Sequence, residues 1–403
     1  MEQALEERIR RELADGLARE TAPADAVEIP PIPVERYVCP DFYELEQEHV
    51  WGRSWLFAGH ESELPEPGSF KLFDKTTAPL VIVRGQDGVI RAFYNACRHR
   101  GAPVVREECG TAKRLTCLYH SWSYDTSGEL RAIPDNRNFV DVDQDALGLA
   151  PVRCESSDGF LFVSEDPDAP PLREHLGPLV DQMAEIDGPS LRIVGRQQYR
   201  IECNWKLLVD AFSEVYHIRT VHPDNAALLY DDRSVTVAML PNGHARLNVA
   251  KKPELVPLTA PGPDADNPSV GELWRETSTS FGIFPNLVVP MDAGAFSWIC
   301  MWPIDVRTTE LELVWFAPDW GDGDPSPEHE MRMTLFETVM AQDTENMNAI
   351  QRSVESRGAQ PFRIGWHERL IHHFHRSVDL AIGDDVPEGY GVSDALDRFV
   401  EAG

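Results

Sequence analysis

The chain has 403 residues, and its 37 Lys and Arg against 67 Asp and Glu give a formal net charge of −30. This length suggests two or three domains, and a hydrophobic content of 42% is that of a globular protein. The acidic balance argues against a nucleic-acid partner and against docking on an anionic membrane, because both need a basic face.

The location of the protein is indicated by what the sequence lacks. No segment reaches the roughly 18 consecutive apolar residues of a membrane span, and the charged N-terminus is unlike a secretory signal. Seven scattered cysteines give no disulfide framework and fit a reducing compartment. We therefore expect a cytoplasmic protein.

The pattern along the chain predicts two domains behind an N-terminal extension. Residues 1–40 are interpreted as a surface helix, over 1–21, and a Pro-rich linker. Short β-rich runs between Gly, Pro and Asp fill residues 41–165 and predict an all-β domain. Residues 166–403 combine long amphipathic segments with strands, which predicts an α+β domain.

Two tight Cys–His pairs stand out in the β domain: Cys97 with His99, and Cys117 with His120. Two short loops of this kind can hold one metal centre. A Cys₂His₂ set can bind zinc, but structural zinc loops usually pair Cys with Cys. The C-x-H and C-x-x-H order is that of a Rieske [2Fe–2S] cluster, with two Cys on one iron and two His on the other. Four buried residues without a metal remain the plain alternative.

A second candidate metal site lies in the α+β domain. His217 and His222 are five residues apart near the end of a helix expected over 205–221, and Pro223 follows. Because proline disfavours helical geometry in the residue before it, the helix should end near His222 and the two imidazoles can converge. Two His and one carboxylate form the facial triad of non-haem Fe(II) oxygenases. A His pair alone is more often a capping or packing feature.

The carboxylate should come from the last long helix, expected from about residue 327 to 357. Its apolar residues recur at helical spacing, and Asp343 falls near that stripe, so it can face inward. Glu337 and Glu345 are the alternatives.

Three sequence boxes together resemble the α subunits of Rieske non-haem iron oxygenases, the aromatic ring-hydroxylating family. These boxes are CRHRGAPV from Cys97, CLYHSWSYDTSGEL from Cys117, and NWKLLVDAFSEVYHIRTVH from Asn204. The resemblance extends over about residues 40–380. It implies an α+β protein with an N-terminal all-β Rieske domain, a C-terminal helix-grip (START-like) catalytic domain, a [2Fe–2S] cluster and a mononuclear Fe(II).

The resemblance also assigns individual residues. The family has a D-x₇-Q context for its third iron ligand, and Asp343 with Gln351 fits it. Ser121 is a departure, because the family usually has Gly there.

Two acidic residues precede the His pair on the expected helix. Glu214 lies three residues before His217, hence on the same face. In the family, the carboxylate at this position bridges an iron-ligand His to a cluster-ligand His of the neighbouring subunit, which by position is His120. The family usually has Asp; the Glu variant resembles the carnitine and betaine branch and some ring-hydroxylating relatives. Asp210, four residues before Glu214, is a weaker candidate for supporting Lys206 or the iron site. His372, His373 and His375 are interpreted as a solvated helix face.

The implied function is that of a terminal oxygenase. Electrons from a reductase or ferredoxin reach the cluster and cross a subunit boundary to Fe(II), which activates O₂ beside a small organic substrate. Such subunits are commonly trimers or trimer-based assemblies, some with a β subunit. The alternatives are mono-oxygenation by dealkylation or carnitine/betaine-like oxidation, a pure electron-transfer Rieske protein, and a zinc hydrolase.

The substrate and the electron donor are predicted from side-chain type alone. No compact motif for an anionic substrate stands out, so we expect a bulky aromatic or ring substrate, as in aromatic hydrocarbon catabolism. The expected pocket residues are Phe212, Phe281, Phe284, Asn286, Val288 and Trp298. Basic residues crowd the cluster loops and predict a docking patch for an acidic ferredoxin or reductase, with encounter rates that fall as salt rises; they are Arg98, Arg100, Arg106, Lys113 and Arg114.

Overall fold

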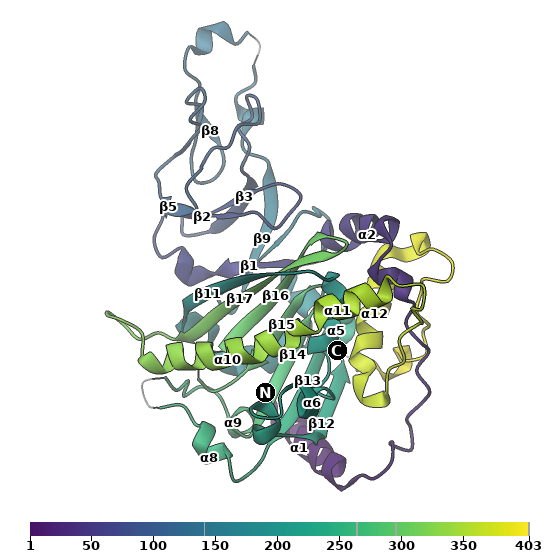
Figure 1. The fold of residues 1–403 in the computed structure, drawn as a ribbon. Helices are drawn as coiled ribbons and strands as arrows, with labels where there is room; N and C mark the ends of the chain where they lie inside the picture. The colour runs from purple at the N-terminus through teal and green to yellow at the C-terminus, as the bar shows by residue number, and fades with distance from the viewer. Residues whose placement is uncertain (141, 263–264, 295, 402–403) are drawn as a thin grey trace. The chain divides into compact units, whose positions relative to one another are not determined.

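The computed structural model describes residues 1–140, 142–262, 265–294 and 296–401. They form two units, shown as a ribbon in Figure 1. The smaller unit runs from Trp51 to His175; the larger one combines Met1–Val50 with the chain from Leu176 onward.

The regular structure of the smaller unit is mainly β-strand. Seven form one sheet in the order β1-β10-β9-β4-β3-β2-β5, and a three-stranded sheet β6-β7-β8 accompanies it. The strands are β1 (Leu56–His60), β2 (Ser69–Phe73), β3 (Leu80–Arg84), β4 (Ile90–Tyr94), β5 (Cys109–Thr111), β6 (Leu115–Thr116), β7 (Ser123–Tyr124), β8 (Leu130–Ala132), β9 (Pro151–Ser157) and β10 (Phe160–Ser164). β3 reads LVIVR, a β-branched run that is favoured in a pleated, buried strand. The core includes Val81, Phe93 and Tyr124 together with Cys97 and Cys117.

The larger unit has one antiparallel seven-stranded sheet, in the order β11-β17-β16-β15-β14-β13-β12. The strands are β11 (Leu191–Ile201), β12 (Tyr230–Met239), β13 (Ala245–Lys251), β14 (Thr277–Ile283), β15 (Leu287–Met291), β16 (Phe296–Asp305) and β17 (Thr308–Pro318). Along β14, buried and half-buried residues alternate, as expected for a sheet whose two faces have different surroundings.

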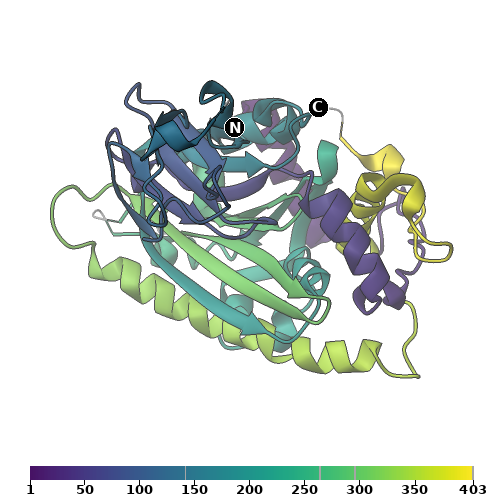
Figure 2. The ribbon, with the colours of Figure 1, turned by 90° about the horizontal axis from the view of Figure 1, so that it is seen from above.

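Helices cover this sheet and complete the unit. The chain's α-helices are α1 (Gln3–Ala18), α2 (Pro40–Glu46), α3 (Leu172–Leu176), α4 (Leu179–Met183), α5 (Trp205–Phe212), α6 (Ile218–Val221), α7 (Ala226–Leu229), α8 (Val256–Thr259), α9 (Glu272–Glu276), α10 (Pro327–Glu345), α11 (Met347–Val354) and α12 (Arg369–Ile382). Helices α10 and α11 follow one another along the sheet (Figures 1 and 2). The ring of Trp315 on β17 meets that of Phe336 on α10 at 5.3 Å, which places α10 on the Trp315 face. Among the described residues, no helix combines the length and the apolar character that crossing a membrane requires.

The expected fold class is confirmed: an all-β unit and an α+β unit in which a long helix packs on an antiparallel sheet. The expected boundary differs, because residues 41–50 pack with the larger unit. The N-terminal segment buries side chains there: Glu46 of α2 is fully buried, and Ser234 Oγ on β12 donates to the carbonyl of Leu13 on α1.

Both long helices expected in the second domain are interrupted. The segment 205–221 forms α5 and α6 with a turn between them. Ser213 Oγ donates to the carbonyl of Val209 at 2.6 Å, and the Glu214 carboxylate accepts the N–H groups of Tyr216 and His217, so local side chains replace the helical pattern. The segment 327–357 is divided at Asn346 into α10 and α11.

The interpretation of the α12 histidines as solvated is wrong. His372 and His375 are fully buried, and His373 is 7% exposed. The polar face of α12 is covered because other segments pack on it. His373 Nε2 lies 3.0 Å from the carbonyls of Leu240 and His244, and Arg36 of the N-terminal segment donates to His375 Nδ1.

These histidines predict acid sensitivity. In the described chain, neither ring nitrogen of His372 has a hydrogen-bond partner. Its pKa is lowered from 6.5 to about 4, chiefly by burial; the charges of His375, His373 and Arg376 act in the same direction, and Asp397 opposes them. A folded-state pKa below the unfolded value means that the folded protein binds fewer protons, so stability is lost as the pH falls from 6.5 toward 4. The loss from His372 is about 3 kcal/mol.

Thermal unfolding of the wild type and of His372→Leu, followed across this pH range, measures the effect. We expect a flatter pH dependence in the variant. His367→Gln is the control, because that imidazole is 42% exposed. Equal slopes for all three proteins would contradict the prediction.

Candidate active site

Two loops of the smaller unit bring the four expected cluster ligands together. Cys97 and His99 follow β4, and Cys117 and His120 lie between β6 and β7. The imidazole centroids of His99 and His120 are 4.7 Å apart. Both Cys are buried; burial raises the pKa of the Cys97 thiol, and the neighbouring Cys117 thiol raises it further. The thiols therefore lie inside, whereas His120 is exposed and His99 is half-buried, an arrangement that fits a cluster bound by two Cys and two His.

The two loops close in the same way. The N–H of Gly101 donates to the carbonyl of Cys97 at 2.8 Å, and the N–H of Ser121 donates to the carbonyl of Cys117 at 2.9 Å. Gly101 has a φ of 75° and Ser121 a φ of 59°. Ser121 thus occupies a left-handed conformation that glycine adopts at little cost, which explains why glycine is usual at this position in the family.

Aromatic side chains support the loops. Tyr124 Oη lies 3.3 Å from Cys97 Sγ and accepts the N–H of Arg98 at 2.9 Å. The indole of Trp122 stacks on His99 with 7° between the planes. The five basic residues expected around these loops are all exposed, and Arg100 lies over the ring of Tyr119, next to His120.

The larger unit brings together the three expected iron ligands. His217 and His222 flank α6, and Asp343 lies on α10. One ligand atom from each residue lies within 4.8 Å of the other two. His222 Nε2 is 2.7 Å and His217 Nε2 is 3.4 Å from Asp343 Oδ1. Two imidazole nitrogens and one carboxylate oxygen are a donor set that suits non-haem Fe(II).

The alternative carboxylates lie elsewhere. Glu337 accepts hydrogen bonds from Gln197 and Tyr199 on β11, and Glu345 is exposed.

Each imidazole of the candidate iron site is oriented by an oxygen atom that lies near its Nδ1, on the side away from Asp343. His217 Nδ1 lies 2.5 Å from Glu214 Oε1, and His222 Nδ1 lies 2.8 Å from Gln342 Oε1. A carboxylate or amide oxygen only accepts, so each Nδ1 carries the hydrogen and each Nε2 is available to a metal. Gln342 was not expected from the sequence; its position next to Asp343 is the only signal that could have pointed to it.

Burial lowers the pKa values of both imidazoles, but the nearby acceptors outweigh it. The pKa of His217 is raised by the Glu214 hydrogen bond and charge and by Asp343. The pKa of His222 is raised by Asp343 and Gln342. A raised pKa means that each imidazole binds its second proton more readily, and a metal ion bound at Nε2 would replace that proton.

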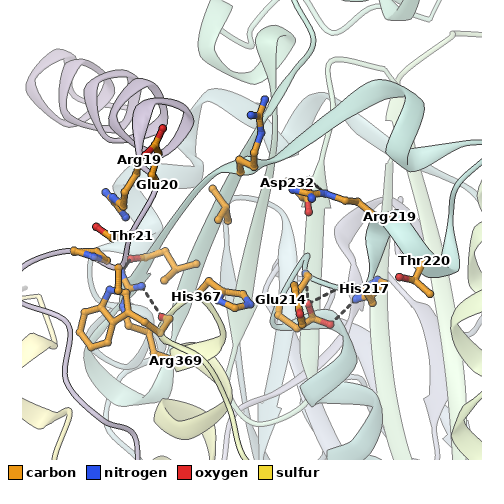
Figure 3. A pocket seen from close by; sticks show the side chains of 18 residues that line it. Arg19, Glu20, Thr21, Glu214, His217, Arg219, Thr220, Asp232, His367 and Arg369 are labelled. Atoms are coloured by element: carbon orange, nitrogen blue, oxygen red, sulfur yellow. Dashed lines mark hydrogen bonds and ion pairs between the residues drawn. The ribbon is translucent and has the colours of Figure 1, made fainter.

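Glu214 lines a surface pocket of about 670 Å³ together with His217, Tyr216 and His367 (Figure 3). Residues 19–23 of the N-terminal segment form another part of its wall. The side chain of His217 is 24% exposed and that of Glu214 is 10% exposed, so the edge of the candidate iron site faces this pocket.

Asp210 does not lie on the same face as Glu214, since α5 ends at Phe212, between them. Its carboxylate accepts a hydrogen bond from Tyr37 Oη at 2.6 Å and lies 3.1 Å from His375 Nε2. Lys206 pairs instead with Glu46 at 2.6 Å.

The expected pocket residues lie in different places. Val288 pairs with Ile299, Ile299 with Leu313, and Leu313 with Gln197, whose side chain bonds to α10, so Val288 lies on the α10 face. Trp298 is one residue before Ile299 and points to the other face.

Phe281 also lies on the far face, because it pairs with Val289 and its ring meets that of Trp274 on α9. This placement argues against Phe281 and Trp298 as neighbours of the iron ligands. Phe284 contacts Phe374 of α12, Asn286 donates to the carbonyl of Met301, and Phe212 is the half-buried last residue of α5.

Two family models match the chain. The Rieske [2Fe-2S] domain matches residues 54–151, and the ring hydroxylating alpha subunit (catalytic domain) matches residues 189–384. The chain belongs to the family of Rieske oxygenase α subunits. Its two domains are of the kinds that hold a [2Fe–2S] cluster and a mononuclear non-haem iron.

Curated relatives fall into two groups. The chain is 38% identical over 190 residues to biphenyl 2,3-dioxygenase subunit alpha of Rhodococcus jostii (strain RHA1), in a match that covers 46% of this chain and 41% of that protein. The match thus spans about two-fifths of the length of that relative. The chain is 28% identical over 365 residues to the carnitine monooxygenase oxygenase subunit of Escherichia coli (strain K12), covering 88% of this chain and 94% of the relative.

Solved structures share the fold. A quaternary ammonium Rieske monooxygenase in complex with L-carnitine has a TM-score of 0.74 at 22% identity, over 90% of this chain and 99% of that chain. Naphthalene 1,2-dioxygenase from Rhodococcus sp., bound to indole, has a TM-score of 0.74 at 22% identity, over 96% of this chain and 100% of that chain.

The matched loop closures predict opposite effects of two substitutions. A Cβ on Gly101 would meet no heavy atom within 4 Å, so Gly101→Ala costs only backbone strain. We expect it to lower the free energy of unfolding of the smaller unit by about 1 kcal/mol. Ser121→Gly should not lower it. Guanidinium unfolding, followed by the cluster's visible absorbance, checks both. Destabilisation by Ser121→Gly would show that the Ser121 side chain contributes more than its backbone.

The bond from Glu214 to His217 predicts that Glu214→Gln weakens metal binding. Loss of the carboxylate charge behind a ligand imidazole should lower Fe(II) affinity about 10-fold to 100-fold. Fe(II) titration of protein carrying its cluster measures this. Glu337→Gln is a matched control, because that carboxylate accepts a hydrogen bond from Gln197 on β11 and is not one of the candidate iron ligands or their partners. Equal affinities in both variants would contradict the assigned role.

Proposed function

We propose that this protein is the terminal component of a Rieske oxygenase, which uses O₂ and electrons from a separate reductase or ferredoxin to oxidise a small organic substrate. The observation that carries the proposal is the convergence of His217, His222 and Asp343 within 4.8 Å, in a chain that also has the paired Cys–His loops. When bound, the [2Fe–2S] cluster would supply single electrons, and a mononuclear Fe(II) would supply oxygen activation.

The chain's own residues would hold and orient these groups. Cys97, Cys117, His99 and His120 would hold the cluster, whose His side is the exposed one. Glu214 and Gln342 fix the ligand imidazoles by holding Nδ1–H. This leaves Nε2 of each imidazole directed at Asp343.

Electron entry is supported by the charge of the cluster loops. The chain has a net charge of −30, yet its five basic residues near the loops are all exposed. An acidic ferredoxin or reductase domain would be attracted to these cluster loops and repelled by the acidic remainder of the surface.

Electron exit is proposed to cross to a neighbouring copy in a trimer-based assembly, with or without a β subunit. His120 is exposed on the cluster loop, and Glu214 and His217 line an open pocket. This pocket would receive the cluster loops of a neighbouring copy. One solved relative, a quaternary ammonium Rieske monooxygenase, is described as revealing inter-subunit electron transfer.

For the substrate, we favour an uncharged ring compound and ring hydroxylation. The α10 face of the sheet presents apolar side chains such as Val288, Ile299 and Leu313. The 38% identity to biphenyl 2,3-dioxygenase subunit alpha supports the same class.

A second candidate is mono-oxygenation of a quaternary amine. It is favoured by Glu214 in place of Asp and by the match to the carnitine monooxygenase subunit over 88% of the chain. Mass spectrometry of the product formed with labelled O₂ separates the candidates, because mono-oxygenation adds one labelled atom and dihydroxylation adds two.

Complementation tests the oxygenase and its electron route together. His217→Ala should keep the cluster's visible spectrum and lose substrate-coupled O₂ uptake, since it removes one iron ligand. Cys97→Ser should lose the cluster and be equally inactive. Oligomers assembled from both variants should recover part of the activity, because each supplies what the other lacks.

The outcomes are distinguishable. Full activity of His217→Ala alone would contradict the iron site. Inactive mixed oligomers, with both variants shown to assemble together, would contradict transfer between copies.

A further inference from the structure

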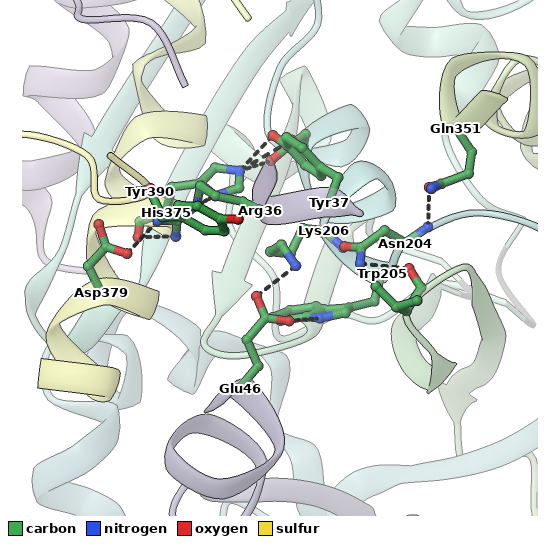
Figure 4. A network of polar contacts seen from close by, with 12 residues as sticks. Arg36, Tyr37, Glu46, Asn204, Trp205, Lys206, Gln351, His375, Asp379 and Tyr390 are labelled. Carbon is green, nitrogen blue, oxygen red and sulfur yellow. Dashed lines mark hydrogen bonds and ion pairs between the residues drawn. The ribbon is translucent and has the colours of Figure 1, made fainter. Parts of the chain in front are cut away.

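Helix α5 is a buried element held by polar groups from distant parts of the chain (Figure 4). At its first turn, the Asn204 side chain accepts the N–H of Lys206, and the N–H of Asn204 donates to Gln351 on α11 at 2.8 Å. Trp205 Nε1 donates to Glu46 at 3.0 Å, and the fully buried Lys206 pairs with the same carboxylate. These contacts fix the beginning of the helix.

The last turn of α5 is anchored by Asp210. Tyr37 Oη donates to Asp210 Oδ2, and His375 Nε2 bonds to Oδ1. His375 Nδ1 in turn accepts a hydrogen bond from Arg36 Nε at 3.1 Å. Because an arginine only donates, His375 must carry its hydrogen on Nε2 and give it to Asp210. The partners of Asp210 are therefore two directional donors, one from the N-terminal segment and one from α12.

The position of Asp210 is energetically unfavourable for a carboxylate. Its side chain is 11% exposed, and it lies in the C-terminal turn, where the helix dipole disfavours negative charge. A buried carboxylate is tolerated only when donors satisfy it. An apolar residue would pack this position more cheaply, but it would not fix the rotation of the helix about its axis.

The anchored turn leads directly into the metal-ligand loop. The N–H of Ser213 donates to the carbonyl of Asp210 at 3.1 Å. Glu214 follows and closes the loop on His217, and Val215 packs against the cluster that includes Leu370 of α12. The direction in which the loop leaves α5 is thus set at Asp210.

We propose that Asp210 is a positioning residue for the mononuclear metal site. Through Tyr37 and His375 it locks α5 to the N-terminal segment and to α12, and so holds His217 at bonding distance from its partner ligands. The proposal rests on the proposed iron site.

The network offers a matched control. Asp379 on α12 is also a buried carboxylate, 6% exposed, that pairs with Arg36 at 2.5 Å and accepts the N–H of Val392. Among the described residues, it makes no hydrogen bond or ion pair with α5 or the ligand loop. Asp379→Asn therefore perturbs the same network without releasing the ligand loop.

Fe(II) titration of the full-length, cluster-loaded oligomer tests the proposal, with thermal unfolding measured in parallel. Asp210→Asn should lower Fe(II) affinity about 10-fold or more and alter the electron paramagnetic resonance spectrum of the Fe(II)–nitric oxide adduct. Tyr37→Phe should act in the same direction more weakly, and it serves if Asp210→Asn does not fold. Asp379→Asn should reduce stability and leave affinity and spectrum unchanged.

Two results would overturn the proposal. One is wild-type affinity and spectrum in both Asp210→Asn and Tyr37→Phe. The other is an affinity loss in Asp379→Asn that matches Asp210→Asn, since the effect would then follow stability alone. Failure of the proposed iron site itself gives a different result. In that case the wild type and His217→Ala would bind Fe(II) equally well or not at all.

Discussion

The Glu214 carboxylate closes the loop that carries His217, and the rest of the candidate iron site depends on that closure. One oxygen holds the His217 ring at Nδ1, and the other accepts the N–H groups of Tyr216 and His217. The imidazole is left with one direction for Nε2, toward Asp343. These local bonds tie the carboxylate to the backbone two and three residues further along the chain.

The two metal-binding regions solve opposite problems. The cluster loops bury both thiols and leave His120 exposed and His99 half-buried, so a cluster held there would have an edge open to electron-transfer partners. The candidate iron ligands are mostly buried, and the His217 side is partly open to a pocket. This contrast fits a division of labour in which one unit exchanges electrons with partners and the other keeps a reactive centre away from bulk water.

The N-terminal segment has a larger role than a linker. Arg36, Tyr37 and Glu46 bury charged or polar groups beside α5 and α12, which come from positions more than 150 residues away. The segment therefore belongs to the unit that holds the candidate iron ligands. It also forms part of the wall of the pocket next to His217.

The sequence by itself indicated the candidate ligands of both metal sites. Short loops bring together the members of each Cys–His pair, Cys97 with His99 and Cys117 with His120. His217 and His222 are likewise only five residues apart in the chain. Local spacing is a property of the chain, so it could be read directly. Only the tertiary structure decided what lies across from what. It showed that Asp210 binds Tyr37 and His375, that the α12 histidines are buried, and that Phe281 and Trp298 face away from α10. Those facts depend on how segments hundreds of residues apart pack, and on strand register, in which a shift of one residue exchanges the two faces of a sheet.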